Sequence, residues 1–163
     1  MPNYQGVWSL SEQYQNASGW PVPPTPPIGL FQLETTIEFI NISTTGNAAD
    51  FGDKTTSVHH CGACGSSTRG IFGGGENTTN IIDFVTFASA GNATDFGDLT
   101  LATTAVGISN ETKGVFQENQ TTPAAGSMSQ ITIASTGNAA SFGDLSVARG
   151  VSGSGSSAHG GLT

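Results

Sequence analysis

Histidine and cysteine side chains gather in one short segment of the chain, HHCGAC at 59–64. Cysteine thiolates and histidine nitrogens are the ligands that tetrahedral zinc prefers, so His59, His60, Cys61 and Cys64 are weak metal candidates. A strong zinc signature has two separated ligand pairs, whereas this cluster stands alone. A redox role for the C-x-x-C pair lacks the βαβ context of such motifs. Small residues fill the corresponding positions in the other repeats described below, so the segment predicts structural packing and no bound metal.

Carboxylates recur at a fixed position in a repeated octapeptide. GNAADFGD at 46–53 returns as GNATDFGD at 91–98 and as GNAASFGD at 137–144. A period of about 45 residues is typical of stacked supersecondary units. The aspartate that ends each copy follows a glycine, where a short carboxylate can accept backbone N–H groups and stabilise a turn. Calcium binding is the alternative, because hard cations prefer clustered oxygens. The aspartates are Asp53, Asp98 and Asp144.

Two further positions of the octapeptide predict structural roles. Its first glycine precedes an asparagine, and both residue types tolerate the positive φ of a tight reversal between strands. Its phenylalanine is the same large apolar residue in every copy, which predicts a core plug beneath the turn. The glycines are Gly46, Gly91 and Gly137, and the phenylalanines are Phe51, Phe96 and Phe142.

The elements that position these residues are expected to be strands. Short apolar runs rich in β-branched and aromatic residues, such as 37–42 and 81–87, precede the octapeptides. The chain has 23 glycines and 10% charged residues, and it offers little helical pattern beyond 7–15. These features predict an all-β fold of about three repeat units, near 29–69, 70–113 and 114–163, in a propeller-like or three-sheet prism-like body. The matching sequence phases at Gly29 and Gly160 favour closure within one chain, although propellers usually have about four to eight blades.

Charge and composition exclude several classes of function. The net charge of −8, with only four basic residues, argues against nucleic acid as a ligand, because phosphate neutralisation needs many Lys and Arg side chains. No apolar run is long enough to span a bilayer, so no membrane partner is expected. No nucleophile motif or acid/base pair emerges, and Gly73–Gly75 lacks the Lys-Ser/Thr of a phosphate-binding loop. The chain is therefore expected to be neither an enzyme nor a cofactor binder.

Residues 1–28 differ from the repeats. All four Trp and Tyr residues lie in the first twenty positions, ahead of the proline-rich run 21–27. Proline-rich segments form extended, semi-rigid spacers, and Trp and Tyr dominate the anchors of protein interfaces. The segment is thus predicted to be a docking arm; packing back on the repeat body is the alternative. The anchor candidates are Tyr4, Trp8, Tyr14 and Trp20.

Two phrases resemble a known family. The order STRGIFGGG at 67–75, an apolar strand at 81–85 and DFGDLT at 95–100 resembles a kelch-like propeller blade with its glycine doublet. It is similar, more narrowly, to repeats in virion proteins of marine cyanophages and related viruses. The resemblance covers residues 29–163, and the opening YQGVWSLSEQYQ also looks like the start of such proteins. Two features depart from the pattern: Gln117-Glu118-Asn119 replaces the triple glycine, and the third copy ends early at Gly160-Gly161-Leu162.

The resemblance implies a structural role on a virus particle. A compact body on a docking arm looks most like a small head decoration protein, similar to the knob-like proteins on capsids of short-tailed marine cyanophages. Its partner would be the major capsid protein, its location the capsid surface after assembly in the host cytoplasm, and a host surface glycan a further ligand. The alternative is a tail-fibre or receptor-binding module that recognises host surface glycans.

Overall fold

The chain folds into antiparallel β-sheets. The computed structural model describes residues 27–76, 79–121, 124–147 and 154–156, and within these ranges there is no helix. The prediction of an all-β protein is therefore confirmed. No helix long and apolar enough to cross a membrane occurs in the described residues. The predicted arm lies outside the described residues except for Pro27 and Ile28.

Most strands have six residues or fewer, and most are bounded by turns of small or polar residues. In chain order they are β1 (Ile28–Asn41), β2 (Ala49–Val58), β3 (Gly62–Gly65), β4 (Arg69–Gly73), β5 (Ile81–Thr86), β6 (Thr94–Asp98), β7 (Thr104–Ser109), β8 (Lys113–Thr121), β9 (Ala124–Ala125), β10 (Ser127–Thr132) and β11 (Ala140–Asp144).

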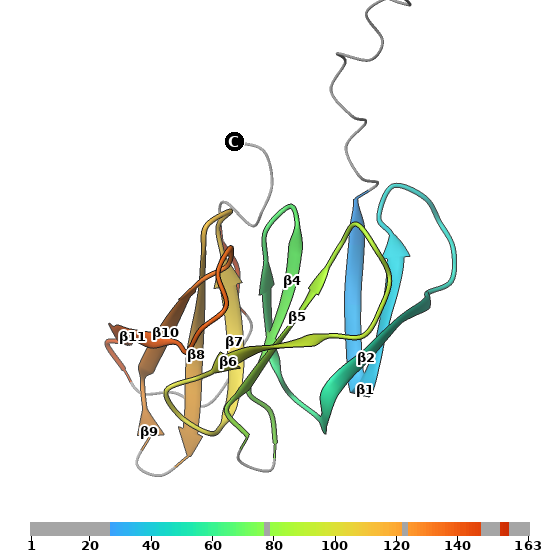
Figure 1. Cartoon of the computed structure of the whole chain (residues 1–163). Helices are drawn as coiled ribbons and strands as arrows, with labels where there is room; N and C mark the ends of the chain where they lie inside the picture. The colour runs from blue at the N-terminus through green and yellow to red at the C-terminus, as the bar shows by residue number, and fades with distance from the viewer. Residues whose placement is uncertain (1–26, 77–78, 122–123, 148–153, 157–163) are drawn as a thin grey trace, which may run out of the picture.

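The strands form three sheets in a row. The second sheet has the order β3-β4-β5-β6 and the third the order β11-β10-β8-β7, with β9 paired to the end of β8. Both are meanders in which consecutive strands pair, and the first sheet consists of β1 and β2. Figure 1 shows β1 and β2 at one end of the row and β11 at the other. Among the described residues the row is open at both ends.

Strand β1 contains two arms that correspond to two strands of the other sheets. The backbone reverses at Glu34, which has a φ of 56°. The Ile42 N–H then donates to the Pro27 carbonyl at 2.8 Å, which brings the two ends of β1 together. The equivalent bonds in the later sheets join Phe87 to Thr68 and Ile133 to Thr112. The first arm of β1 therefore matches β4 and β8, and the second matches β5 and β10.

The sheets divide the chain at other points than the predicted units. The second and third sheets begin at Gly62 and Thr104, whereas the sequence was divided near 70 and 114. The reason is that the small-residue strands β3 and β7 pair forward, with β4 and β8, and do not close the preceding sheet. The first sheet has no described strand equivalent to β3 or β7.

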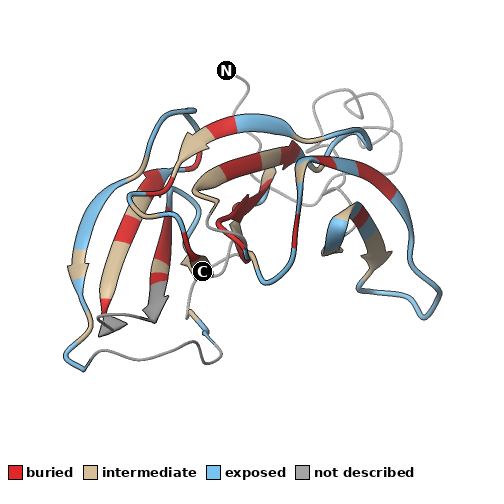
Figure 2. Cartoon of the chain, turned by 90° about the horizontal axis from the view of Figure 1, so that it is seen from below, coloured by how far each residue is buried: buried red, intermediate tan, exposed pale blue. Residues whose placement is uncertain are grey.

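The apolar core lies between neighbouring sheets. One cluster joins the second and third sheets, and a second cluster joins the first and second sheets. Seen from below, the sheets follow a curved course, with buried positions in the strands and exposed loops at the rim (Figure 2). The large, fully buried side chains include Phe116, Ile37, Ile71 and Ile82. Each sheet is stabilised chiefly by burying a face against its neighbour, as in other repeat proteins.

Candidate functional site

The octapeptide forms the same β-bulge in all three copies. The pairing register shifts once in each, so that Gly52 faces Ile37, Gly97 faces Ile82 and Gly143 faces Met128, with the phenylalanine before each glycine left as the extra residue. These second glycines have φ values of 149°, 145° and 137°. The positive φ that we expected at the first glycine of each copy occurs there only at Gly137, with a φ of 154°. The bulge explains the difference, because it requires the unusual backbone inside the strand.

The bulge of one unit binds the start of the octapeptide of the next unit. The Gly91 N–H donates to the Phe51 carbonyl and the Ala93 N–H donates to the Asp53 carbonyl, both at 2.7 Å. The Asn92 side-chain oxygen accepts the Asp53 N–H at 3.1 Å. We call this set of contacts the seam.

A second seam repeats the first with the same geometry. Gly137 N–H to Phe96 carbonyl and Ala139 N–H to Asp98 carbonyl are again 2.7 Å, and Asp98 N–H to Asn138 Oδ1 is again 3.1 Å. The bulge glycine is required for this approach. A Cβ at Gly52 would lie 2.4 Å from the Gly91 carbonyl carbon, and one at Gly97 would lie 2.5 Å from the Gly137 oxygen. The repeated octapeptide is thus an interface between units as well as a turn.

The octapeptide phenylalanine is buried in two of the three copies. Phe51 is 4% exposed and packs with Phe72 and Val85 of the following sheet, and Phe96 is 2% exposed in the equivalent place. Phe142 is 51% exposed, against our expectation of a core plug. It has no following unit among the described residues. The ring that packs edge-on against Phe51 and Phe96, Phe39 or Phe84, is also replaced by a glutamine in the third copy.

The repeat aspartates contribute through their backbone. Asp53 and Asp144 are exposed, and the hydrogen bonds of the seam use the main-chain N–H and carbonyl of the aspartate. The side chain that accepts a backbone N–H is the asparagine of the next unit, Asn92 or Asn138. The capping that we expected of the carboxylate is therefore performed across the seam by an amide.

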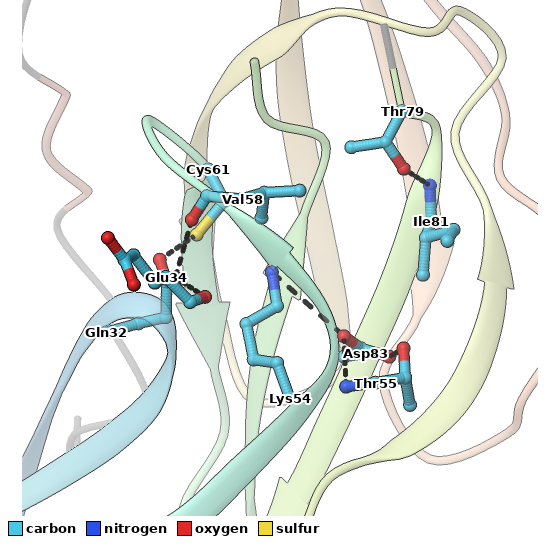
Figure 3. A network of polar contacts seen from close by, with 9 residues as sticks. All are labelled: Gln32, Glu34, Lys54, Thr55, Val58, Cys61, Thr79, Ile81 and Asp83. Atoms are coloured by element: carbon cyan, nitrogen blue, oxygen red, sulfur yellow. Dashed lines mark hydrogen bonds and ion pairs between the residues drawn. The ribbon is translucent and has the colours of Figure 1, made fainter. Parts of the chain in front are cut away.

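A buried carboxylate joins the first unit to the second. Asp83 on β5 is fully buried and accepts the Thr55 hydroxyl at 2.7 Å and the Thr55 N–H at 3.3 Å. The buried Lys54 ammonium lies 4.0 Å from the same carboxylate. Figure 3 shows Lys54 and Thr55 converging on Asp83. A buried charge is tolerated only when it is paired and hydrogen-bonded, and these contacts meet that requirement.

In the third sheet the buried carboxylate comes from a different strand, β8. Ser129 occupies the place of Asp83, and its buried hydroxyl has no hydrogen-bond partner among the described atoms. Glu118 on β8, fully buried, accepts instead the Thr100 hydroxyl at 2.6 Å, the Thr100 N–H at 2.9 Å and the Leu101 N–H at 3.2 Å. Thr55 and Thr100 hold the same position after their octapeptides. Each of the two carboxylates therefore joins two neighbouring sheets.

The histidine and cysteine cluster is divided among different contacts. Cys61 donates to Gln32 Oε1 at 2.7 Å, as Figure 3 shows, whereas Cys64 packs against the core between the second and third sheets. His60 Nδ1 lies 2.5 Å from a Glu76 oxygen. No three His, Cys, Asp or Glu side chains come together as a metal site in the part of the chain that the structure describes. His59 Nε2, for its part, lies 3.9 Å from Glu34 Oε1.

Both thiols are held in their neutral form by burial. Desolvation raises the pKa of Cys64 to about 12 and also raises the pKa of Cys61, where the Lys54 charge acts in the opposite direction. Because the thiolate is the nucleophile and the metal ligand, neither cysteine has the environment of a reactive residue.

A groove of about 500 Å³ runs between β3 and β7. Its walls are mostly small residues and backbone, because Gly62 and Gly107 let the two strands approach closely. Polar side chains on its rim include His60 and Ser154. A ligand site normally offers several convergent polar groups, so this groove resembles a contact between two packed strands more than a catalytic cleft.

Sequence reasoning missed Asp83 and Glu118 and could not place the arm. A lone carboxylate within the apolar run IIDFV was a signal for Asp83, whereas Glu118 stands where the second unit has Gly74 and had no such signal. The docking candidates Tyr4, Trp8, Tyr14 and Trp20 lie outside the described residues, as do Gly160 and the closing phase of the repeat.

No protein-family model matches the chain, and no curated protein matches it.

Proposed function

We propose that this protein is a non-enzymatic structural component of a virus particle, a capsid decoration protein whose N-terminal arm binds the major capsid protein. The observation that carries the proposal is the use of the repeated residues. The phenylalanine, the two glycines and the asparagine of the octapeptide all serve contacts between units. A chain whose invariant residues are devoted to joining sheets is suited to building and presenting a surface.

The buried polar groups support the same proposal. The carboxylates of Asp83 and Glu118 are fully buried and accept hydrogen bonds from hydroxyl and backbone donors, so neither faces the solvent from which a substrate would bind. An acid/base catalyst needs a carboxylate within reach of a bound molecule. The chemistry of both residues is therefore structural, and binding without turnover follows as the proposed activity.

The finer architecture belongs to this proposal. Four-stranded meanders arranged along a curve are consistent with kelch-like units of a propeller-like or three-sheet prism-like body. Such a body would project from the capsid while the arm, residues 1–28, engages the capsid protein. Trp and Tyr side chains supply large contact area at low entropic cost, which suits them to that role.

Mixing purified protein with virus heads that lack it tests the proposal. We expect the full chain to sediment with the heads, and the variant with Tyr4, Trp8, Tyr14 and Trp20 all changed to alanine to remain in the supernatant with an unchanged melting temperature. The matched control replaces Ser9, Gln5 and Gln13 of the same arm with alanine and should bind as the full chain does. Imaging of intact protein on the tail, or normal head binding by the aromatic variant, would contradict the decoration role and favour the tail-fibre alternative.

A further inference from the structure

Among the described residues, the two ends of the row carry halves of the same seam that have no partner. We propose that the chain associates head to tail with a second copy of itself, through a third seam between the last octapeptide of one chain and the first octapeptide of the next. The proposal rests on the two seams within the chain and is independent of any role on a virus particle.

The last octapeptide presents one half of the seam. In the first two copies the residues equivalent to Phe142 and Asp144 bind the next unit through two carbonyls and one N–H. In the third copy these groups have no partner in the described part of the chain. The Phe142 side chain is 51% exposed, and a Cβ at Gly143 would meet nothing within 4 Å. We call this surface the trailing end; it comprises Phe142, Gly143, Asp144 and Ser146.

The first sheet presents the other half. Gly46 and Asn47 have no partner among the described residues, whereas their equivalents in the later octapeptides bind a preceding bulge. Ala48 is exposed, whereas Ala93 and Ala139 are half-buried. The apolar residues that cover the plug in the internal seams are exposed here as well. Phe31, the equivalent of Phe72 (3%) and Phe116 (0%), is 58% exposed. Ile42, the equivalent of Ile133 (1%), is 64% exposed. We call this surface the leading end; it comprises Phe31, Glu38, Ile42, Gly46, Asn47 and Ala48.

The two ends match group by group. If two chains repeated the internal pattern, the Gly46 and Ala48 N–H groups would face the Phe142 and Asp144 carbonyls, and Asn47 would face the Asp144 N–H. The plug Phe142 would then meet Phe31, Ile40 and Ala48, as Phe96 meets Phe116, Ile131 and Ala139. Gly143, with a φ of 137°, already has the positive-φ conformation that the internal bulge glycines use at their seams.

A polar pair completes the match. Ser146 follows its octapeptide at the position of Thr55 and Thr100, whose hydroxyl and N–H bind a buried carboxylate of the next sheet. Glu38 holds the position of Asp83 on the first sheet and is exposed. In the chain-to-chain seam the Ser146 hydroxyl would donate to the Glu38 carboxylate. A foreign partner would have to reproduce all of these groups in the same order, whereas a second copy carries them already.

The contact is heterologous, because each chain uses a different surface on either side. Repetition of one heterologous contact gives a ring when the rotation closes and a filament when it does not. Each chain carries a net charge of −8, so added salt should favour association by screening the repulsion between copies.

Sedimentation of the full chain over a concentration range from about 1 µM to about 1 mM, where weak interfaces form, tests the proposal. We expect the average mass to rise with concentration. Gly143→Ala should remain a folded monomer, because its added methyl blocks only the trailing end, and Glu38→Lys should remain a monomer because it blocks only the leading end. Thr132→Ala, an exposed change on the solvent side of β10, is the control and should associate like the unmodified chain.

Two combinations separate this geometry from other modes of association. An equimolar mixture of Gly143→Ala and Glu38→Lys should form a dimer that does not grow, since each variant keeps one intact end. The double variant Glu38→Lys with Ser146→Glu should recover association, because the two charges then meet across the seam. A full chain that stays monomeric throughout the range overturns the proposal. So does association that Gly143→Ala leaves unchanged, or a mixture that stays monomeric.

Discussion

The bulge glycines show how much one absent side chain can decide. Gly97 and Gly143 share the same backbone conformation, but only Gly97 lies against a neighbouring unit. The loss in free energy of unfolding on adding a methyl group therefore differs between the two positions only by the contact across the seam. The sequence repeat by itself treats the two residues as equivalent.

A glycine pair measures the seam within one molecule. We expect Gly97→Ala to lower the free energy of unfolding by about 3 kcal/mol or more, because it adds both backbone strain and a clash with the Gly137 carbonyl. Gly143→Ala should cost about 1–2 kcal/mol, from the backbone strain alone. Urea denaturation at low micromolar concentration, where chains are separate, gives both values. Equal losses in the two variants would show that the contact across the seam contributes nothing.

The buried thiol of Cys64 predicts a dependence on pH. Its pKa is raised to about 12 in the folded chain, so the neutral form stabilises the fold. The contribution is complete below the ordinary thiol pKa of about 8.5 and is lost as the pH rises toward 12, by up to about 1.4 kcal/mol per unit of pH. Urea denaturation between about pH 8 and about pH 11, where a thiol begins to titrate in the unfolded chain, should show a steeper fall in the free energy of unfolding for the unmodified chain than for Cys64→Ala. Parallel curves would contradict the assignment.

Among the elements, β5 and β8 each supply a buried carboxylate that joins two sheets. Each delivers a buried carboxylate to the threonine that follows the preceding octapeptide, Asp83 from β5 and Glu118 from β8. In the third sheet Glu118 supplies the carboxylate that Ser129, at the position of Asp83, lacks.

An exchange of carboxylates between strands tests this equivalence. Glu118→Ala leaves the Thr100 hydroxyl and two backbone N–H groups without their acceptor, so we expect a loss of about 3 kcal/mol in the free energy of unfolding. Adding Ser129→Asp should restore part of the loss, because aspartate then occupies the place that Asp83 has in the second sheet. Glu111→Ala, which removes an exposed acceptor for Ser67, is the control and should cost less than about 1 kcal/mol. If the double variant recovers none of the lost free energy of unfolding, the two carboxylate positions are not equivalent.

Much of the architecture was predictable, and the exceptions have physical causes. The octapeptide and the apolar runs predicted the strands and the all-β class, because hydrophobic pattern and turn residues are local signals. Local signals do not predict which strand β3 pairs with, where the bulge lies or which residues form the seam. These features depend on contacts between residues that are far apart in the sequence. Glu118 was hidden for the same reason, since its partner Thr100 lies in the preceding octapeptide and on another strand.

At the scale of the whole molecule, stability should be greatest in the middle. The second sheet packs against a neighbour on both faces through two seams, whereas the first and third sheets have one seam each in the described residues. In repeat proteins each unit is stabilised by its neighbours, so the ends open first.

Hydrogen exchange measures this gradient. We expect the slowest amide exchange in β4 and β5, and faster exchange in β1 and β11 under native conditions at low concentration. At high concentration β11 should gain protection if chains join end to end. Uniform protection across the three sheets would contradict a stability assembled from neighbouring contacts.

The seam also has a consequence for how such a gene can change. Everything that it requires lies within eight residues that recur almost unaltered, so unequal recombination between the gene segments of two copies would insert or remove the 45 residues that separate Gly46 from Gly91. The product would keep a complete seam at every remaining junction. Its length could therefore drift in whole units during descent, with selection acting on reach while the joint itself stays unchanged.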